Sequence, residues 1–349
     1  MTFILHIGAP KTGTTAIQKS LLEASNSKKL EKKNILYLNN QECKKDIIFL
    51  AHNNVTQSPR RFRVNSPFNE SELKEISINY LKKLQKEKKY KHYISSSESL
   101  FRLNEEEIIN LKRNISKISK DMKVIYFIRN PLDHYVSRVS QNSKFLSYLN
   151  PKIEDYKYEI LMGINNWKKI FKENFLIFEY DKYIENEGKI VGYFSDIVNN
   201  LIYKGLFRRI NNLKLKNQLS ASNVSLSAEM LLAIKKYRLK YKLKDEKKYP
   251  SLMKEVKKIA KKDFIKEQNT IKLSKNAKSF FINENIELYR LLKSFNFKYL
   301  GNWEDDLADG QSLKFISDKK YELEDLLEFY DKRIIEKIFL NLEKYTKIN

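Results

Sequence analysis

The sequence is poor in the residues that build disulfides, turns and membrane spans. Among its 349 residues, Cys43 is the only cysteine, eight residues are glycine and six are proline. A single cysteine excludes an internal disulfide and any zinc site built from several cysteines. No stretch approaches 18 uninterrupted apolar residues, so we expect no transmembrane helix. The first apolar run meets Gly8 and Pro10 too early for a secretion signal, which predicts a cytoplasmic protein.

Acidic residues are also fewer than basic ones. The chain has 67 lysines and arginines against 43 aspartates and glutamates, a formal net charge of +24. This balance indicates an anionic partner, such as a nucleotide, an acidic glycan or the acidic inner face of a membrane. A lysine-rich composition with solvated helical faces is the alternative explanation. No nucleic-acid-binding motif is visible, so we expect no nucleic-acid partner.

A glycine loop lies between a strand pattern and a helix pattern at the start of the chain. "FILHI" (3–7) predicts a short buried strand, and "TTAIQKSLLEAS" (14–25) predicts an amphipathic helix. The stretch between them, "GAPKTGTT" (8–15), approaches the triphosphate loop G-x-x-x-x-G-K-[ST]. However, Thr14 replaces the usual lysine, and the lysine lies earlier, at Lys11. Glycines and a helix N-terminus together predict a site for a phosphate-like anion.

The rest of the chain predicts an α/β fold. Helical patterns alternate with β-prone runs, which is typical of a parallel sheet with helices on both faces. These runs cover residues 35–38, 92–96, 123–128 and 174–180. Beyond residue 200 the pattern becomes helical and lysine-rich, with helices predicted at 225–238 and 282–295. We therefore expect a P-loop-type α/β domain over 1–310, ending in a lysine-rich helical part, and a helical extension over 311–349.

A second strand-to-helix junction carries polar residues at a defined spacing. "YFIRNPLDHYVS" (126–137) places Arg129 at the end of a predicted strand. Asn130 suits a helix N-cap and Pro131 suits the first helical position. Ser137 follows Arg129 by eight residues, on the predicted helix.

Together, the two motifs resemble those of sulfotransferases. "PKTGTT" (10–15) is similar to their 5′-phosphosulfate loop of PKSGTT type, and Arg129 with Ser137 resembles their 3′-phosphate site. The resemblance implies 3′-phosphoadenylyl sulfate (PAPS) as donor, adenosine 3′,5′-bisphosphate as product, and no required metal. It implies that Lys11 stabilises the leaving phosphate. The donor-binding residues that it implies are Lys11, Thr12, Gly13, Thr14, Thr15, Arg129 and Ser137.

An acceptor hydroxyl needs a general base. Glu98, in "HYISSSESL" (92–100), directly follows a predicted strand and resembles the "SSE" stretch of many bacterial sulfotransferases. His52 is the second candidate, because cytosolic relatives use a histidine, and His134 is the third. Glu98 has an alternative role as the acidic start of a helix predicted near 104–115.

The resemblance has one gap and leaves the acceptor open. The late RKG-type segment that clamps the 3′-phosphate in cytosolic sulfotransferases is not recognisable, and "YLGNW" (299–303) is only a faint echo of it. Bacterial polysaccharide-modifying members imply a glycan acceptor, on a cell-surface polysaccharide or glycolipid, sulfated at a hydroxyl or amine. One alternative is a P-loop kinase, against which the missing lysine at position 14 argues. Another is a non-enzymatic polyanion-binding protein. For the enzyme, peripheral contact with the acidic inner face of the membrane is a further expectation.

Overall fold

A computed structural model describes the chain as two compact units. The first comprises Met1–Arg129 with Tyr158–Leu219, and the second Asn130–Lys157 with Ser220–Asn349. The residues that the structure describes are 1–38, 70–87, 89–98, 100–142, 152–156, 158, 161, 163–182, 189–203, 213–215, 226–241, 271–298, 300, 303–305, 307 and 322–348.

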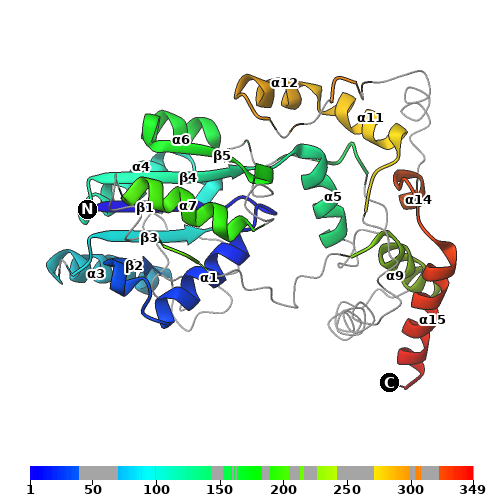
Figure 1. Ribbon diagram of the computed structural model, residues 1–349, viewed down its shortest axis with the longest axis horizontal. Coiled ribbons are helices and arrows are strands. Elements are labelled where there is room, and N and C mark those ends of the chain that lie inside the picture. The colour runs from blue at the N-terminus through cyan, green and yellow to red at the C-terminus, as the bar shows by residue number, and fades with distance from the viewer. Residues whose placement is uncertain are drawn as a thin grey trace. The chain divides into compact units, whose positions relative to one another are not determined.

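A five-stranded parallel sheet forms the centre of the first unit (Figure 1). Its strands are β1 (Thr2–Ile7), β2 (Ile35–Leu38), β3 (His92–Ser97), β4 (Asp121–Ile128) and β5 (Phe175–Glu179). The spatial order is β2-β3-β1-β4-β5, and every neighbouring pair is parallel. At the carboxyl end of β1, Ile7 pairs with Ser97 of β3 and Tyr126 of β4. The glycine loop that follows therefore starts between the ends of two other strands.

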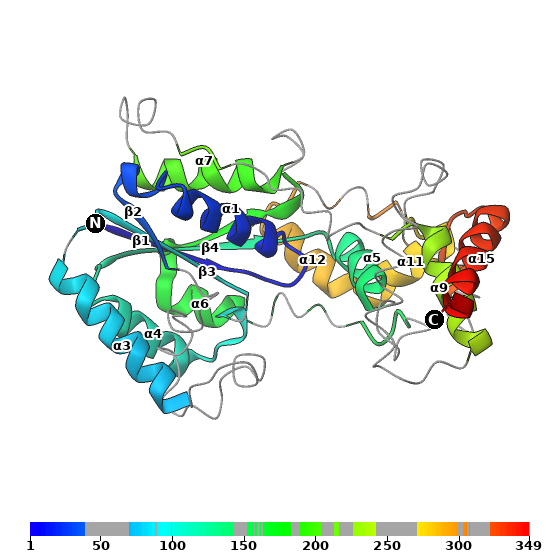
Figure 2. The same cartoon turned by 90° about the horizontal axis from the view of Figure 1, so that it is seen from below.

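Helices cover both faces of this sheet (Figure 2). One face carries α1 (Thr14–Asn26) and α7 (Ile190–Ile202), and the other carries α3 (Glu70–Glu87), α4 (Glu105–Ile115) and α6 (Ile164–Phe171). Short 3-10 turns occupy Glu31–Lys33, Leu100–Arg102 and Lys172–Asn174. This arrangement confirms the predicted α/β fold.

The core between the sheet and the α1/α7 layer follows the two sequence periodicities. Strand side chains at alternate positions meet helix side chains at three- and four-residue spacing. Its fully buried members include Ile4, Ile125, Phe127, Ile17, Leu21 and Phe194. Each such side chain contributes about 1.5–3 kcal/mol through burial, which holds the start of α1 in a fixed place below the loop.

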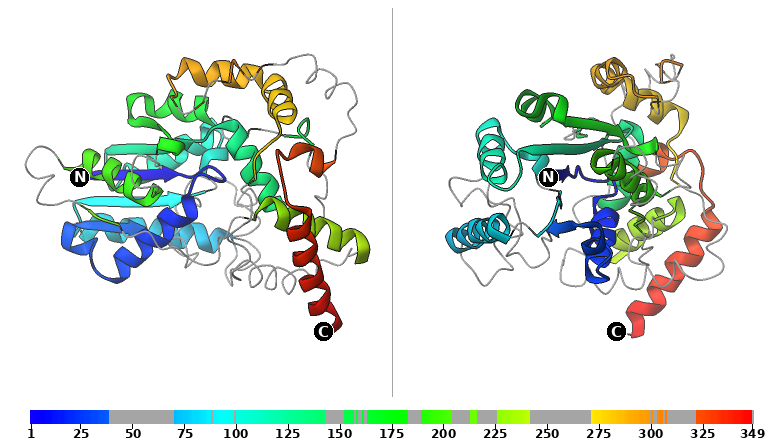
Figure 3. Two further views of the ribbon diagram at one scale, coloured as in Figure 1. Left: turned by 45° about the vertical axis from the view of Figure 1, so that its right-hand side comes forward. Right: turned by 60° about the vertical axis from the view of Figure 1, so that its left-hand side comes forward.

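Most of the described part of the second unit is helical. Its helices are α5 (Pro131–Asn142), α9 (Ala228–Tyr241), α11 (Lys275–Glu284), α12 (Ile286–Ser294), α14 (Leu323–Leu326) and α15 (Lys332–Ile348). The helices α9 and α15 lie side by side (Figures 1 and 3), and the ring centroids of Tyr237 and Phe339 are 6.4 Å apart. The two helices of the predicted 311–349 extension thus belong to this unit, while the boundary near residue 310 stays a prediction.

The helix predicted over 282–295 needs correction. The structure has two helices here, because the chain leaves helical geometry at Asn285, with φ −118° and ψ 21°. The Asn285 side chain stabilises the break, since its Nδ2 donates to the carbonyl of Phe281 at 2.9 Å. The first helix begins much earlier, after Ser274, whose Oγ accepts from the N–H of Ala277 at 3.3 Å. No helix in the described ranges has the length and apolarity to cross a bilayer.

Candidate active site

The glycine loop joins β1 to α1 at the carboxyl edge of the sheet. Its first residue, Gly8, donates its N–H to the carbonyl of Ser97 at 3.0 Å. Its last glycine, Gly13, is the N-cap of α1 in the left-handed conformation, with φ 75° and ψ 8°. A glycine cap has no side chain to accept the first N–H groups of the helix, and no side-chain cap bond is present there. The start of α1 is thereby suited to an external anion.

Steric limits explain the two glycines. A Cβ atom at Gly8 would lie 2.3 Å from Oγ1 of Thr14, and one at Gly13 would lie 3.0 Å from the side chain of Ile190. Lys11 also has a positive φ, 63°, although it is not glycine. A left-handed lysine costs about 1 kcal/mol, and such strain is typical of ligand-binding loops.

The side chains of the loop divide into inward and outward ones. Thr12 is fully buried, and its Oγ donates to the carbonyl of Ala9 at 2.8 Å. Thr14 is also buried, with its Oγ 3.4 Å from the same oxygen. Thr15 is exposed and Lys11 is half-buried. Either hydroxyl would have to turn away from Ala9 to donate to a ligand.

Arg129 adds a second cation at the loop. Its Nη1 donates to the carbonyl oxygen of Lys11 at 3.1 Å. Its guanidinium carbon lies 5.1 Å from the ring centroid of Tyr180, and its Nε lies 3.9 Å from Oδ1 of Asp181. Tyr180 also flanks the loop, since its Cε2 would be 3.2 Å from a Cβ atom at Gly13. Although it is 118 residues from Lys11 in sequence, Arg129 is thus kept beside the loop by contacts with the Lys11 carbonyl, Tyr180 and Asp181.

Glu98 directly follows β3 and is half-buried. Because the neighbouring Ser97 accepts the N–H of Gly8, the Glu98 turn adjoins the start of the loop. The start of α4, its alternative role, is capped by two other residues. Oδ1 of Asn104 accepts from the N–H of Glu107 at 3.0 Å, and the Glu107 carboxylate accepts from the N–H of Asn104 at 2.8 Å.

Comparison with known protein families identifies the family of this chain. The family model described as "Sulfotransferase domain" matches residues 2–272. The chain belongs to the sulfotransferase family. Neither the curated proteins nor the solved structures compared with it contain a match. Membership makes the protein a transferase of sulfuryl groups, with a nucleotide donor and an acceptor substrate.

The structure does not place the three other predicted site residues of this sulfotransferase at the glycine loop. His52 lies outside the described residues. His134, on α5, is fully buried with its Nδ1 2.7 Å from the hydroxyl of Tyr156, so it cannot touch an acceptor in this structure. Ser137 is half-buried on α5 and belongs to the second unit, so its pairing with Arg129 stays a prediction.

Two residues beside the glycine loop were not among the residues predicted from the sequence. Tyr180 and Asp181 directly follow β5 and contact Arg129. Polar side chains that follow parallel strands gather at one edge of the sheet, and this rule would have singled them out. Within the described ranges, no three His, Cys, Asp or Glu side chains are grouped closely enough to hold a metal ion.

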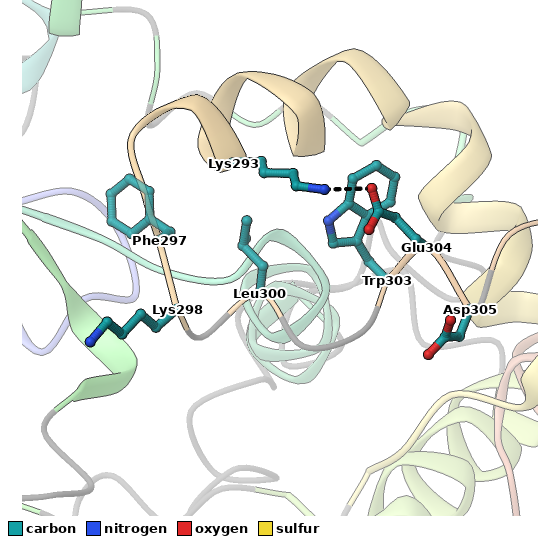
Figure 4. Close-up of a pocket in the computed structure, with 7 residues that line it drawn as sticks. All are labelled: Lys293, Phe297, Lys298, Leu300, Trp303, Glu304 and Asp305. Carbon is teal, nitrogen blue, oxygen red and sulfur yellow. Dashed lines mark hydrogen bonds and ion pairs between the residues drawn. The ribbon is translucent and has the colours of Figure 1, made fainter.

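A separate pocket lies in the second unit of the sulfotransferase, at the end of α12 (Figure 4). It has a volume of about 380 Å³ and is lined by Lys293, Phe297, Lys298, Leu300, Trp303, Glu304 and Asp305. Lys293 pairs with Glu304 at 2.7 Å, and two carboxylates balance the two lysines. Trp303 is 6% exposed, and the centroid of its ring lies 5.4 Å from that of the Tyr289 ring. It therefore belongs to the core and offers no open platform for a sugar ring.

Proposed function

We propose that this sulfotransferase uses PAPS to sulfate a hydroxyl or amine of a glycan, on a cell-surface polysaccharide or glycolipid. The observation that carries the donor assignment is the start of α1. Its N–H groups follow a glycine cap, and Lys11 and Arg129 lie at the same loop. This arrangement suits PAPS, whose phosphosulfate presents several anionic oxygens to the backbone donors and Lys11, and whose 3′-phosphate is a second anion for Arg129.

In the proposed mechanism the transfer is in line. The acceptor oxygen or nitrogen forms a bond to the sulfur as the bond from sulfur to the bridging phosphate oxygen breaks. Adenosine 3′,5′-bisphosphate leaves, and the Lys11 ammonium and the first N–H groups of α1 stabilise the charge that grows on its 5′-phosphate. A sulfuryl group carries less negative charge than a phosphoryl group, so one lysine can take the place of a magnesium ion.

The position of the donor in the site is assigned to contacts with its 3′-phosphate, at the other end of the nucleotide from the sulfate. Arg129 and Ser137 would hold the 3′-phosphate, in agreement with the resemblance of their spacing. The position of Arg129 beside the loop supports its half of this assignment, because its guanidinium lies next to the backbone of Lys11. Bidentate binding of phosphate is a geometry that a guanidinium favours.

Glu98 is our candidate for the base that takes the proton of the acceptor. Its support is its place beside the first residue of the loop, through the bond from Gly8 to Ser97. His52 is the second candidate. The glycan acceptor rests on the resemblance to bacterial members and on the net charge of +24. The same charge supports a place for the enzyme at the acidic inner face of a membrane.

Ligand choice tests the donor assignment. Adenosine 3′,5′-bisphosphate without magnesium should raise the melting temperature, with about 2.7 kcal/mol of stabilisation at one hundred times the Kd. ATP with magnesium should not. Lys11→Ala should abolish the shift, while Lys29→Ala, an exposed lysine outside the loop, should retain it. Stabilisation by ATP–magnesium alone would favour the kinase. Labelled PAPS with a glycan and lipid extract of the host would then identify the acceptor.

A further inference from the structure

A small polar cluster lies directly below the glycine loop. His6, on β1, is fully buried, and its Nδ1 shares a hydrogen bond of 2.8 Å with Oγ of Ser96 on β3. Gln18, on α1, donates from Nε2 to the carbonyl of Ser96 at 2.9 Å. Within the described residues, β2 pairs with β3 as far as Leu38 and Ser95, and the carbonyl of the next β3 residue, Ser96, accepts from this glutamine. Ser96 is thus tied to β1 through its side chain and to α1 through its backbone.

The cluster connects the two halves of the site. His6 is two residues before Gly8, where the loop begins, and Ser96 is two residues before Glu98. Gln18 lies on α1, the helix that starts at the end of the loop. With the bond from Gly8 to Ser97, three hydrogen bonds join the donor-binding elements to the strand that carries Glu98. A shift of β3 along β1 would move the Glu98 turn and break all three.

A histidine is an unfavourable core residue at this position. Its ring lies 5.5 Å from that of Phe127 and 5.4 Å from that of Phe194, both apolar. Within the described residues, its Nε2 is buried and has no hydrogen-bond partner. Burying an unsatisfied polar atom costs about 1–3 kcal/mol, which an apolar side chain would avoid. Stability alone therefore does not account for His6, and its bond to Ser96 has to be considered for function.

We propose that His6, Ser96 and Gln18 form a brace that sets the distance between the donor loop and the Glu98 turn. They are positioning residues for the transfer step, and this inference rests on the proposed function. His6 and Ser96 are buried, and we assign none of the three a contact with donor or acceptor. Their effect follows from the geometry of catalysis, because a misplacement of about 1 Å can cost about a hundredfold in rate.

Substitutions compared in pairs distinguish a role of these residues in positioning Glu98 from a role in core packing. His6→Leu removes the bond to Ser96 but suits the apolar surroundings, whereas His6→Asn keeps a polar atom at about the distance of Nδ1 from Cβ. Gln18→Leu removes the other bond, and Gln85→Leu, on the exposed side of α3, is the matched control. We expect His6→Leu and Gln18→Leu to lower kcat by about ten- to a hundredfold with labelled PAPS and the glycan extract. His6→Asn should retain most of kcat, and Gln85→Leu all of it.

The affinity for the donor nucleotide distinguishes positioning from a general structural role, because a general disturbance of the fold would also weaken nucleotide binding. In the brace variants, the Kd of adenosine 3′,5′-bisphosphate should change by less than about threefold, because the loop itself is intact. Hydrogen exchange with this nucleotide bound should increase over residues 96–98 and stay unchanged in α1. An unchanged kcat in both leucine variants, or a loss of nucleotide affinity parallel to kcat, would overturn the brace.

The two proposals fail in different ways. If the unsubstituted enzyme shows no thermal shift with adenosine 3′,5′-bisphosphate, the donor assignment is wrong. If it shows the shift and the brace variants exchange like the parent at residues 96–98, the donor assignment stands and the brace is wrong. The exchange experiment needs no acceptor, so it decides the matter before the glycan is identified.

Discussion

Arg129 donates a hydrogen bond from Nη1 to the carbonyl oxygen of Lys11 at 3.1 Å, which joins the two cations of the site through one backbone group. The bond fixes the arginine beside the loop and supports the left-handed backbone of Lys11, with φ 63°. A planar, forked donor is needed to hold this bond while the guanidinium also lies over Tyr180.

Substitution of Arg129 should weaken donor binding more than it weakens the fold. Arg129→Ala should raise the Kd of adenosine 3′,5′-bisphosphate by about ten- to a hundredfold, as expected for loss of a charged hydrogen bond worth about 1.5–3 kcal/mol. Arg129→Lys should recover less than half of that free energy, because an ammonium cannot fork or stack. Calorimetric titration measures both values, with the exposed Arg290→Lys as control. Equal affinity in Arg129→Lys and the parent would contradict this role.

Glu98 should be needed for transfer and not for donor binding. Glu98→Gln keeps the shape of the side chain but cannot take a proton, so kcat should fall by about a hundredfold or more while the nucleotide Kd is unchanged. Rapid-quench measurement with labelled PAPS gives the transfer rate. If transfer survives in Glu98→Gln, the role of base passes to His52, and His52→Ala should then abolish it.

Alanine substitutions at Gly8 and Gly192 should change the free energy of unfolding in opposite directions. Gly8→Ala places a Cβ atom 2.3 Å from the Thr14 side chain and should destabilise the enzyme by about 2 kcal/mol or more. Gly192→Ala, on α7, meets nothing within 4 Å and should stabilise it by about 0.5 kcal/mol. Urea unfolding measures both. Part of the Gly8→Ala cost should disappear in a Thr14→Gly background, which would trace that cost to this contact.

Stability should fall as the pH drops below about 6.5. Burial lowers the pKa of His6 to about 3, and mainly burial lowers that of His92 to about 4. Between about pH 6.5 and 4 the unfolded chain binds protons at these two rings that the folded chain does not bind, so the free energy of unfolding decreases with falling pH. His6 contributes a slope of about 1 kcal/mol per pH unit. His6→Asn should flatten the dependence between about pH 6.5 and 5, and an unchanged slope would refute the assignment.

Lys235 should stabilise the second unit through its stem as well as its charge. Its side chain is 9% exposed, and its Nζ lies 2.8 Å from Glu322 and 2.7 Å from Glu324. Burial lowers the pKa of Lys235, but the two carboxylates outweigh burial and raise it above its ordinary value. Lys235→Ala should cost about 1–2 kcal/mol in urea unfolding, and Lys235→Met clearly less, because methionine retains the apolar stem. Lys236→Ala, half-exposed on the same helix, should be close to neutral.

The local parts of the site could be predicted because they depend on neighbouring residues. The glycine loop, the helix after it and the Arg129-to-Ser137 spacing each lie within about a dozen residues of chain. The break at Asn285 could not be predicted, because helix propensity does not register a side chain that turns back to bond Phe281. Tyr180 and Asp181 were missed for another reason, since their contact with Arg129 depends on the pairing of β5 with β4.

By itself, the sequence determined the order of strands and helices and the glycine loop between β1 and α1, because backbone periodicity and a glycine cap are short-range properties. Only the tertiary structure decided that β1 lies between β3 and β4. That strand order brings Arg129 to Lys11 across 118 residues and Ser96 to His6 across 90. Such contacts depend on how whole strands pair and on what the core buries, and no local pattern in the chain encodes either.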